Sequence, residues 1–262
     1  MNLKLLSLLL AWAGPSLLAA DGPPLKGVAH VALRVADVAK SREFYRVLGW
    51  EQAFEFNDDK GTTTSYVKVN DRQFIELYRR SNPTDAIGLM HLCMEGGDLE
   101  AVAAFYQKAG VTTTDRRKAR AGNLLFNIRD AEGNLIEYTQ YLPGSLHTNE
   151  TGKHVLAERL SDHLIRASLP VKSLAAESAF FIGKLGFIDL GNGRLGAPGA
   201  SGEQIQLEAT TAEWRPRLVF AVTDVKRTAD ELKKRGVPVE MSGDSVVVRD
   251  PDGAILVFSA GR

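Results

Sequence analysis

The feature that most constrains the fold of this chain is an internal repeat with a fixed spacing. Identical residues recur at an offset of 61 positions, without any gap, at His30 and His91, Asp37 and Asp98, Phe44 and Phe105, Tyr45 and Tyr106, Gly49 and Gly110, Ile75 and Ile136, and Glu76 and Glu137. Self-similarity at one period indicates a repeated structural unit. Residues 27–142 are therefore predicted to be two copies of one module, the first covering 27–85 and the second 86–142.

The two copies share one predicted order of elements. Each opens with an apolar, β-rich run, "VAHVALRV" in the first and "LMHLCM" in the second, which is typical of a strand. Asp37 and Asp98 then suit helix N-caps. Gly49 and Gly110 suit the left-handed residue at which such helices end. Extended segments follow, with "RDAEGN" as the turn between the last two. Each module is thus predicted as a strand, a helix and about three further strands.

A second and looser pair of modules follows a polar, turn-rich stretch. Residues 143–160 are predicted to be a linker, and the segment that begins at His163 has the strand and helix pattern of the opening stretch. Further on, "RDPDGAILVF" repeats the "RDAEGNLIEY" of the second module. We therefore expect an α+β fold of four βαβββ modules in two domains, residues 27–142 and 161–262.

Composition excludes several classes of protein. The 262-residue chain has 32 acidic and 32 basic residues, so no basic field exists to attract nucleic acid or an anionic membrane. Its start combines Lys4, a leucine-rich run and small residues at Ala19 and Ala20, which is the layout of a secretory signal peptide. We expect residues 1–20 to be removed during export to the periplasm or the exterior, which leaves no segment that spans a membrane. Cys93 is the only cysteine, so an internal disulfide is excluded.

Four residues of the repeat carry the predicted chemistry. Two histidines, His30 and His91, and two glutamates, Glu76 and Glu137, occupy equivalent strand positions in the two modules. A carboxylate in an apolar strand needs a partner or an ion, because burying an unpaired charge is costly. If the modules pair about a pseudo-twofold axis, all four side chains converge, and one divalent cation satisfies both carboxylates and both imidazoles. The alternative is two separate buried His–Glu pairs.

On these residues the sequence resembles the vicinal oxygen chelate superfamily, which contains glyoxalase I, extradiol dioxygenases and bleomycin-resistance proteins. The matching residues are His30 in "AHVALRVADVAKSREFY", Glu76 in "FIEL", His91 in "MHLCM" and Glu137 in "DAEGNLIEY". Their order is most similar to that of glyoxalase I. The resemblance implies curled mixed sheets with helices on the outside, around one divalent metal held by these four residues. It further implies that Glu76 or Glu137 moves a proton between neighbouring carbons of a small substrate with adjacent oxygens, through a metal-stabilised enediolate.

Strand alternation places further side chains on the face of the ligands. Arg34 shares a face with His30, and Tyr78 shares a face with Glu76. Both are predicted to bind an anionic or polar substrate, with ordinary hydrogen bonding at the rim as the alternative. Cys93 is predicted to pack rather than to react, since no base is evident beside it.

The second pair of modules has lost the ligand set. Its equivalent positions are predicted at His163, Gln206, Arg217 and Val257, with Glu208 on the same face as Gln206. Because a valine cannot bind a metal and an arginine would repel one, residues 161–262 are expected to hold no metal. His163 is expected to have a structural role.

Three further motifs receive weaker roles. The stretch "GNGRLG" has the glycine spacing of a dinucleotide-binding turn, but loop and strand follow it rather than a helix. The basic stretch "DRRKAR" at 115–120 is expected to be a solvated loop, with binding of an anionic substrate as the less favoured role. His147 and His154 in the linker are able to bind metal, but histidines of polar loops are commonly unpaired.

Three activities remain open. Four protein ligands favour a metal-dependent isomerase, lyase or epimerase of the glyoxalase type. The two-pair length resembles extradiol dioxygenases, which use two histidines and one glutamate on Fe(II), so a ring-cleaving dioxygenase is the alternative enzyme. A non-catalytic protein that binds a small molecule is the third. The ligand set accepts Ni, Co, Zn, Mn or Fe. In each case the partner is a small molecule, and the protein is a monomer or a homodimer.

Overall fold

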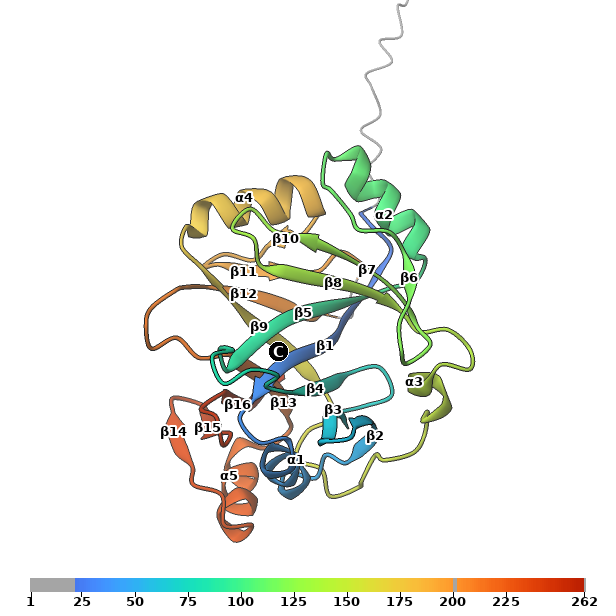
Figure 1. The fold of residues 1–262 in the computed structure, drawn as a ribbon. Helices are drawn as coiled ribbons and strands as arrows, with labels where there is room; N and C mark the ends of the chain where they lie inside the picture. Colours follow the sequence, from blue (N-terminus) through green and yellow to red (C-terminus); the bar gives the residue numbers. More distant parts are fainter. Residues whose placement is uncertain (1–21, 200–201, 262) are drawn as a thin grey trace, which may run out of the picture.

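The computed structural model describes residues 22–199 and 202–261, which form two curled mixed sheets with helices on their outer sides (Figure 1). The strands of the first sheet are β1 (Leu25–Val35), β2 (Gln52–Asp58), β3 (Gly61–Lys68), β4 (Phe74–Arg79), β5 (Gly88–Gly96), β6 (Arg117–Lys118), β7 (Leu124–Arg129) and β8 (Leu135–Gln140). Their order across the sheet is β2-β3-β4-β1-β5-β8-β7-β6. The antiparallel pair β1–β5 forms the central seam, and each of the two runs parallel to the last strand of its own module. The two copies of the repeat therefore pair side by side about this seam.

The second sheet repeats this topology. Its strands are β9 (Leu164–Val171), β10 (Ile188–Asp189), β11 (Arg194–Gly196), β12 (Gln204–Ala209), β13 (Arg217–Val222), β14 (Glu240–Ser242), β15 (Ser245–Arg249) and β16 (Ile255–Ala260). Their order is β10-β11-β12-β9-β13-β16-β15-β14, with β9–β13 as the antiparallel seam. The predicted α+β fold of four βαβββ modules is confirmed.

Helices begin at both predicted N-caps and end before both predicted glycines, and one short helix lies in the segment predicted as a linker. They are α1 (Val38–Val47), α2 (Leu99–Lys108), α3 (Leu146–Asn149), α4 (Leu174–Leu185) and α5 (Val225–Lys234). The side chain of Asp37 accepts from a backbone N–H in the first turn of α1, and Asp98 does the same for α2, so both predicted N-caps are confirmed. Gly49 and Gly110 follow these helices with φ of 89° and 76°, which a side chain would disfavour. A Cβ at Gly49 would also lie 2.5 Å from the Cα of Arg159.

One hydrophobic core spans both sheets. Trp50, just after α1, is fully buried with its ring centroid 4.5 Å from that of Phe220, and its Nε1 donates to the carbonyl of Ser161 at 2.7 Å. At the ends of the helices, Lys184 of α4 donates to the carbonyl of Ala109 after α2. Figure 1 shows the same pairing, with α4 beside α2 and α5 beside α1. The two halves thus pack as one body.

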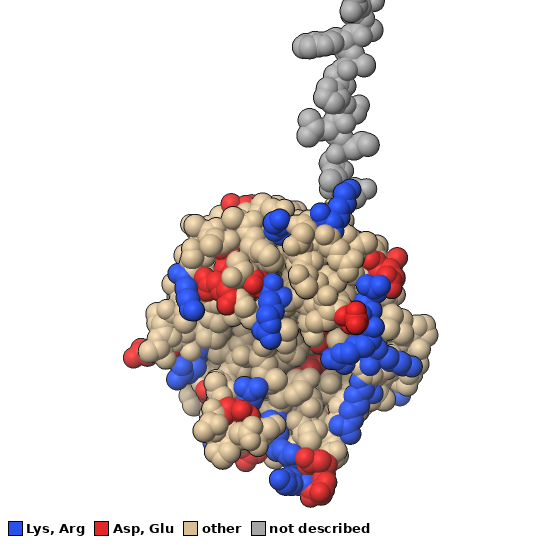
Figure 2. Space-filling model, turned by 45° about the horizontal axis from the view of Figure 1, so that its top comes forward, with Lys and Arg blue, Asp and Glu red and all other residues tan. Residues whose placement is uncertain are grey.

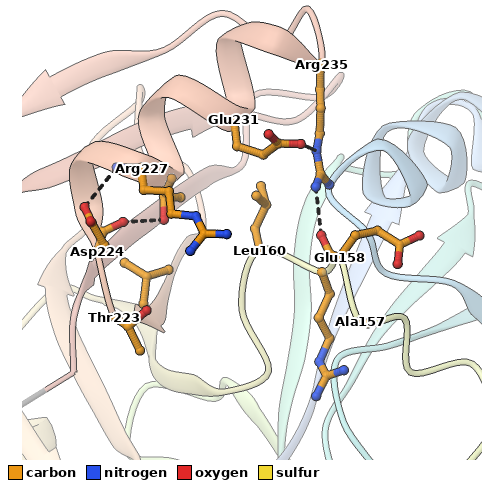
Figure 3. A pocket seen from close by; sticks show the side chains of 11 residues that line it. Ala157, Glu158, Leu160, Thr223, Asp224, Arg227, Glu231 and Arg235 are labelled. Carbon is orange, nitrogen blue, oxygen red and sulfur yellow. Dashed lines mark hydrogen bonds and ion pairs between the residues drawn. The ribbon is translucent and has the colours of Figure 1, made fainter.

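The segment predicted as a linker is docked on both halves. The buried ammonium of Lys68 donates to the carbonyls of Glu150 and Lys153. Arg235, after α5, donates to the carboxylate of Glu231 and to the carbonyl of Glu158, and these contacts border a cavity of about 330 Å³ between residues 157–160 and α5 (Figure 3). None of the four predicted metal ligands lines this cavity. The contact of Arg235 with Glu158 ties residues 143–160, the segment that contains α3, to α5.

The predicted signal peptide, residues 1–20, lies outside the described residues. Within 22–199 and 202–261, no helix has the length and apolar character needed to cross a membrane.

Candidate metal centre

The strand register brings the predicted ligands together. In the parallel pair β1–β4, Ala32 lies opposite Glu76. In the parallel pair β5–β8, Cys93 lies opposite Glu137, and these two pairs are again related by the offset of 61. Across the antiparallel seam, Ala32 also lies opposite His91. Each glutamate is therefore one strand away from the seam at which the two histidines meet.

Contacts among the four side chains centre on the His30 imidazole. Its Nε2 lies 3.1 Å from Nε2 of His91 and 3.4 Å from Oε1 of Glu137. Its Nδ1 lies 3.2 Å from Oε1 of Glu76, but without the alignment of a hydrogen bond. His30, Glu76 and His91 are buried, and Glu137 is nearly so, with 12% of its side chain exposed. Four polar groups thus share a place from which the protein largely excludes water.

Burial and mutual contact set the charges of this group. Burial raises the pKa of Glu76 to about 7, against the attraction of His30. Burial acts in the same sense on Glu137, but the contact with His30 outweighs it and lowers the Glu137 pKa. For His30, burial acts to lower the pKa, and the two carboxylates outweigh it and raise the pKa. Burial lowers the pKa of His91 to about 4. In the metal-free cluster, mutual contact therefore favours the charged forms of Glu137 and His30, and burial favours the neutral forms of Glu76 and His91.

The donor set fits a divalent cation. Ligand atoms of His30, Glu76 and His91 lie within 4.8 Å of one another, and so do those of His30, Cys93 and Glu137. Ligands held about 2.1 Å from one ion in octahedral geometry lie about 3 Å apart, which matches the contacts that Nε2 of His30 makes with His91 and Glu137. Glu76 instead approaches Nδ1, the other nitrogen of the same ring. The buried Nδ1 of His30 has no hydrogen-bond partner. Imidazole and carboxylate suit several first-row ions, so the arrangement supports a metal site without selecting the ion.

A cavity of about 220 Å³ opens onto this cluster. It is lined by His30, Phe56, Thr64, Tyr66, Glu76, Tyr78, Arg117, Ala119, Arg120, Ala121, Asn123, Leu125, Glu137 and His147. Three of the four predicted ligands therefore face it. The hydroxyl of Tyr78 donates to Oε2 of Glu76 at 2.9 Å, which places this predicted substrate-binding residue directly beside the ligands.

Arg34, the other predicted substrate-binding residue, lies in a different place. Its Nη1 donates to the carbonyl of Ala86 at 3.0 Å. With His91 and Arg129 it lines a second cavity of about 400 Å³. The structure therefore puts Tyr78 and Arg34 in separate cavities that border different members of the ligand set. Substrate binding by either residue stays a prediction.

Cys93 is fully buried and lies opposite His30 across the β1–β5 seam. Burial raises the pKa of its thiol, and the neighbouring Glu137 and Glu76 carboxylates add to that effect. A thiol in such a setting is a poor nucleophile, which agrees with the predicted packing role. Its sulfur nevertheless lies within 4.8 Å of a ligand atom of His30 and of one of Glu137, which is close enough for the three to share an ion.

His147 is a residue of the cavity that the sequence reasoning missed. It lies in α3, within the predicted linker, and is only 2% exposed. Its ring stacks on that of Tyr141 with centroids 4.4 Å apart. The rings of Phe54, Tyr66 and Phe74 surround it edge to face, with centroids 5.0 to 5.6 Å away. No local sequence pattern predicts this box of aromatic rings around His147, because its residues come from β2, β3, β4 and the segment after β8.

The basic stretch 115–120 also reaches the cavity. Arg117 and Arg120 line it, and the guanidinium carbon of Arg120 lies 4.2 Å from the centroid of the Phe56 ring. Arg116 instead donates to the Glu100 carboxylate on α2. Two arginines of this loop therefore lie in a position to contact an anionic substrate, which was the less favoured of the two predicted roles.

Equivalent positions in the second sheet hold other residues. Arg166 lies opposite Val219 across the β9–β13 seam, as His30 lies opposite Cys93 in the first sheet. The assignment of His163 to this position was therefore wrong by three residues. His163 comes before β9, where its Nε2 contacts Oε1 of Glu203 at 3.2 Å.

The other three equivalent positions agree with the sequence alignment. Gln206 lies opposite Ser168 and Val257 opposite Val219, in the manner of the two glutamates of the first sheet. Arg217, in the third position, donates from Nε to Oε1 of Glu208 at 3.1 Å. That residues 161–262 hold no metal stays a prediction.

Solved structures similar to this chain include dioxygenases and a glyoxalase. The 2,3-dioxygenase LapB from Pseudomonas sp. KL28 has a TM-score of 0.70 and 18% identity, over 92% of this chain and 93% of that chain. The Mn(II)-bound glyoxalase from Novosphingobium aromaticivorans has a TM-score of 0.68 and 18% identity, over 90% and 82%. A variant of homoprotocatechuate 2,3-dioxygenase from B. fuscum has 0.67 and 18%, over 92% and 72%. At this level of identity these matches establish the fold alone.

A search of curated proteins finds no significant match. Residues 27–138 match the family model described as the Glyoxalase/Bleomycin resistance protein/Dioxygenase superfamily, and this range holds all four predicted metal ligands. The family match confirms the resemblance noted from the sequence over residues 27–138.

Proposed function

We propose that the chain is a metal-dependent enzyme of the isomerase, lyase or epimerase type, which acts on a small molecule with two adjacent oxygens. The observation that carries this proposal is the symmetric donor set, in which Glu76 and Glu137 both face the cavity beside His30. A site with two carboxylates has one available as an acid–base group while the other remains a ligand. A site with a single carboxylate lacks that division of roles.

The side chains have distinct tasks in this scheme. A divalent ion held by His30, His91, Glu76 and Glu137 supplies a Lewis acid for the substrate oxygens. Glu76 or Glu137 takes a proton from one carbon and returns it to the neighbouring one, since both line the cavity. The Tyr78 hydroxyl, by its hydrogen bond to Oε2 of Glu76, orients that carboxylate. The nearly complete burial of the cluster limits competing proton exchange with water.

Metal content and two amide variants test the proposal. We expect the full chain to bind one equivalent of Ni, Co, Zn, Mn or Fe, and Glu76→Gln and Glu137→Gln each to weaken that binding or to abolish turnover. The glutamate that keeps metal but loses turnover when changed is the base. Glu208→Gln in β12 is the matched control, because Glu208 lies two residues after the equivalent position in the second sheet. If no divalent metal binds at micromolar concentration, the site assignment is wrong.

A ring-cleaving dioxygenase of the extradiol type is the second candidate. It is favoured by the extent of the likeness to the 2,3-dioxygenase LapB, which covers more than nine-tenths of both chains. The second glutamate counts against it, because that chemistry is expected to use two histidines and one glutamate. Oxygen uptake by the Fe(II)-loaded protein on catechols would favour the dioxygenase. Small-molecule binding without turnover under all of these conditions would instead indicate a binding protein.

We also propose that the protein is exported, on the signal-peptide pattern of residues 1–20. Expression of the full chain followed by N-terminal sequencing tests this. We expect the mature protein to begin at or near Asp21, and an intact Met1 in the purified protein would contradict export by cleavage.

A further inference from the structure

The mouth of the 220 Å³ cavity carries two cationic side chains that have no carboxylate partner. Arg117 and Arg120 line the cavity, and among the residues that the structure describes neither forms an ion pair. Arg120 is held in place by the Phe56 ring, whose centroid is 4.2 Å from the guanidinium carbon. Figure 2 shows Lys and Arg side chains across the face it presents, with a dense group at the right, the side on which Figure 1 places β6.

Charge balance in the cavity favours an anion. Its lining contains two carboxylates, Glu76 and Glu137, and two arginines. A divalent cation among the ligands offsets both carboxylates, which leaves the arginines as the uncompensated charges of the same cavity. A guanidinium presents a fork of N–H donors that matches a carboxylate. The remaining charge is therefore suited to an acidic group on the substrate.

A further residue of the cavity lining offers a second polar contact. His147 is buried in its box of aromatic rings, lines the cavity, and has no hydrogen-bond partner for either ring nitrogen. A buried polar group without a partner is costly unless something satisfies it. A neutral imidazole presents one donor and one acceptor. A polar atom of a molecule in the cavity is in position to meet one of them.

Resting on the proposed function, we propose that the substrate is a small carboxylate. Its two adjacent oxygens reach the metal ligands, its acidic group binds Arg117 and Arg120, and another of its polar atoms contacts His147. The cavity is smaller than the roughly 300 to 1,000 Å³ of drug-sized sites, so the molecule is small.

Two chelators that differ by one carboxylate test the charge preference. Propionohydroxamate and succinate monohydroxamate both present two adjacent oxygens, and the second carries a carboxylate in place of one methyl hydrogen. By calorimetry on the Zn(II)-loaded full chain, we expect succinate monohydroxamate to bind roughly tenfold tighter or more. The double variant Arg117→Gln, Arg120→Gln should lose this preference and keep its affinity for propionohydroxamate. Arg116→Gln, in the same loop but engaged with Glu100, is the control and should keep the preference.

The outcomes separate the two levels of the proposal. Equal affinity of the wild type for both hydroxamates, or a preference that survives in the double variant, overturns the anion site and leaves the metal site standing. Failure of the chain to bind Zn(II), or of the Zn(II)-loaded wild type to bind either hydroxamate, overturns the proposed function and the anion site with it.

His147 has its own test, because its evidence is independent of charge. His147→Phe keeps the aromatic packing and removes both nitrogens, and we expect both hydroxamates to bind about fivefold more weakly. His147→Gln, which restores a donor and an acceptor, should recover part of that loss. A purely structural role would lower the thermal midpoint without changing either affinity. Unchanged affinities in a folded His147→Phe protein therefore overturn the assignment.

Discussion

The two halves of this chain share a scaffold and differ in the residues placed at its centre. Each module has its key side chain seven residues before the N-cap of its helix: His30 before Asp37, His91 before Asp98, Arg166 before Ser173 and Arg217 before Asp224. The same interval carries histidine in the first half and arginine in the second. Topology therefore fixes where four side chains converge, and only their identity decides whether a cation is attracted or repelled.

The largest effect should come from removing a central residue in each half. His30→Ala deletes the side chain that contacts all three other predicted ligands, and we expect metal affinity to fall by at least about 100-fold, since even changes outside the ligand shell cost about 10 to 100-fold. Arg166→Ala at the equivalent position should leave metal affinity unchanged. Isothermal titration with Zn(II) measures both. Similar losses in the two variants would contradict the assignment of the site to the first half.

A graft tests whether the halves are equivalent in geometry. The changes Arg166→His, Gln206→Glu, Arg217→His and Val257→Glu copy the ligand set into the second sheet, and we expect the metal content to double. The matched control keeps Arg166 and makes only the other three changes, so that His163 is the histidine nearest in sequence to the first ligand position. If the register is right, this control binds no second ion. A second ion bound by the control would show that His163, and not position 166, is the first ligand position.

The repeat made most of the site predictable from sequence. One offset relates His30 to His91 and Glu76 to Glu137, and a strand pairing that obeys the same offset must bring them to one seam. The N-caps at Asp37 and Asp98 followed from side-chain chemistry alone. Because such features are local or periodic, they can be predicted without knowledge of the tertiary structure.

What escaped prediction depends on long-range packing. His147 looked like one more histidine of a polar stretch, because the rings that bury it come from strands distant in sequence. The alignment of His163 followed residue identity, whereas the interval to the cap at Ser173 points to Arg166. Arg117 and Arg120 are exposed, as expected of a solvated loop, but the sequence did not show that they line a cavity, because other strands form it.

A further effect is expected from acid on the imidazole of His147, which is buried beside the first-half cavity. Burial lowers the pKa of His147 to about 3 from the ordinary 6.5. Between these pH values the unfolded chain binds a proton that the folded chain excludes, so stability falls as the pH falls, by on the order of 4 kcal/mol across the window. His147→Phe should flatten this dependence in urea unfolding at pH 7, 5 and 4, whereas the control Tyr141→Phe should retain it. Identical pH profiles for wild type and His147→Phe would contradict the assignment.

The smallest effect concerns what the two halves have in common. Asp37 accepts from the N–H of Lys40, and Asp224 accepts from the N–H of Arg227, so the two caps have the same geometry in opposite halves. Asp37→Ala and Asp224→Ala should therefore each cost about 1 kcal/mol, measured by urea unfolding, with Asp59→Ala in the β2–β3 turn as a neutral control. Costs that differ by more than about 1 kcal/mol would mean that the halves diverge in scaffold as well as in site. Equal costs would confine their divergence to the residues at the centre of each sheet, where the predicted metal ligands lie in one half and two arginines lie in the other.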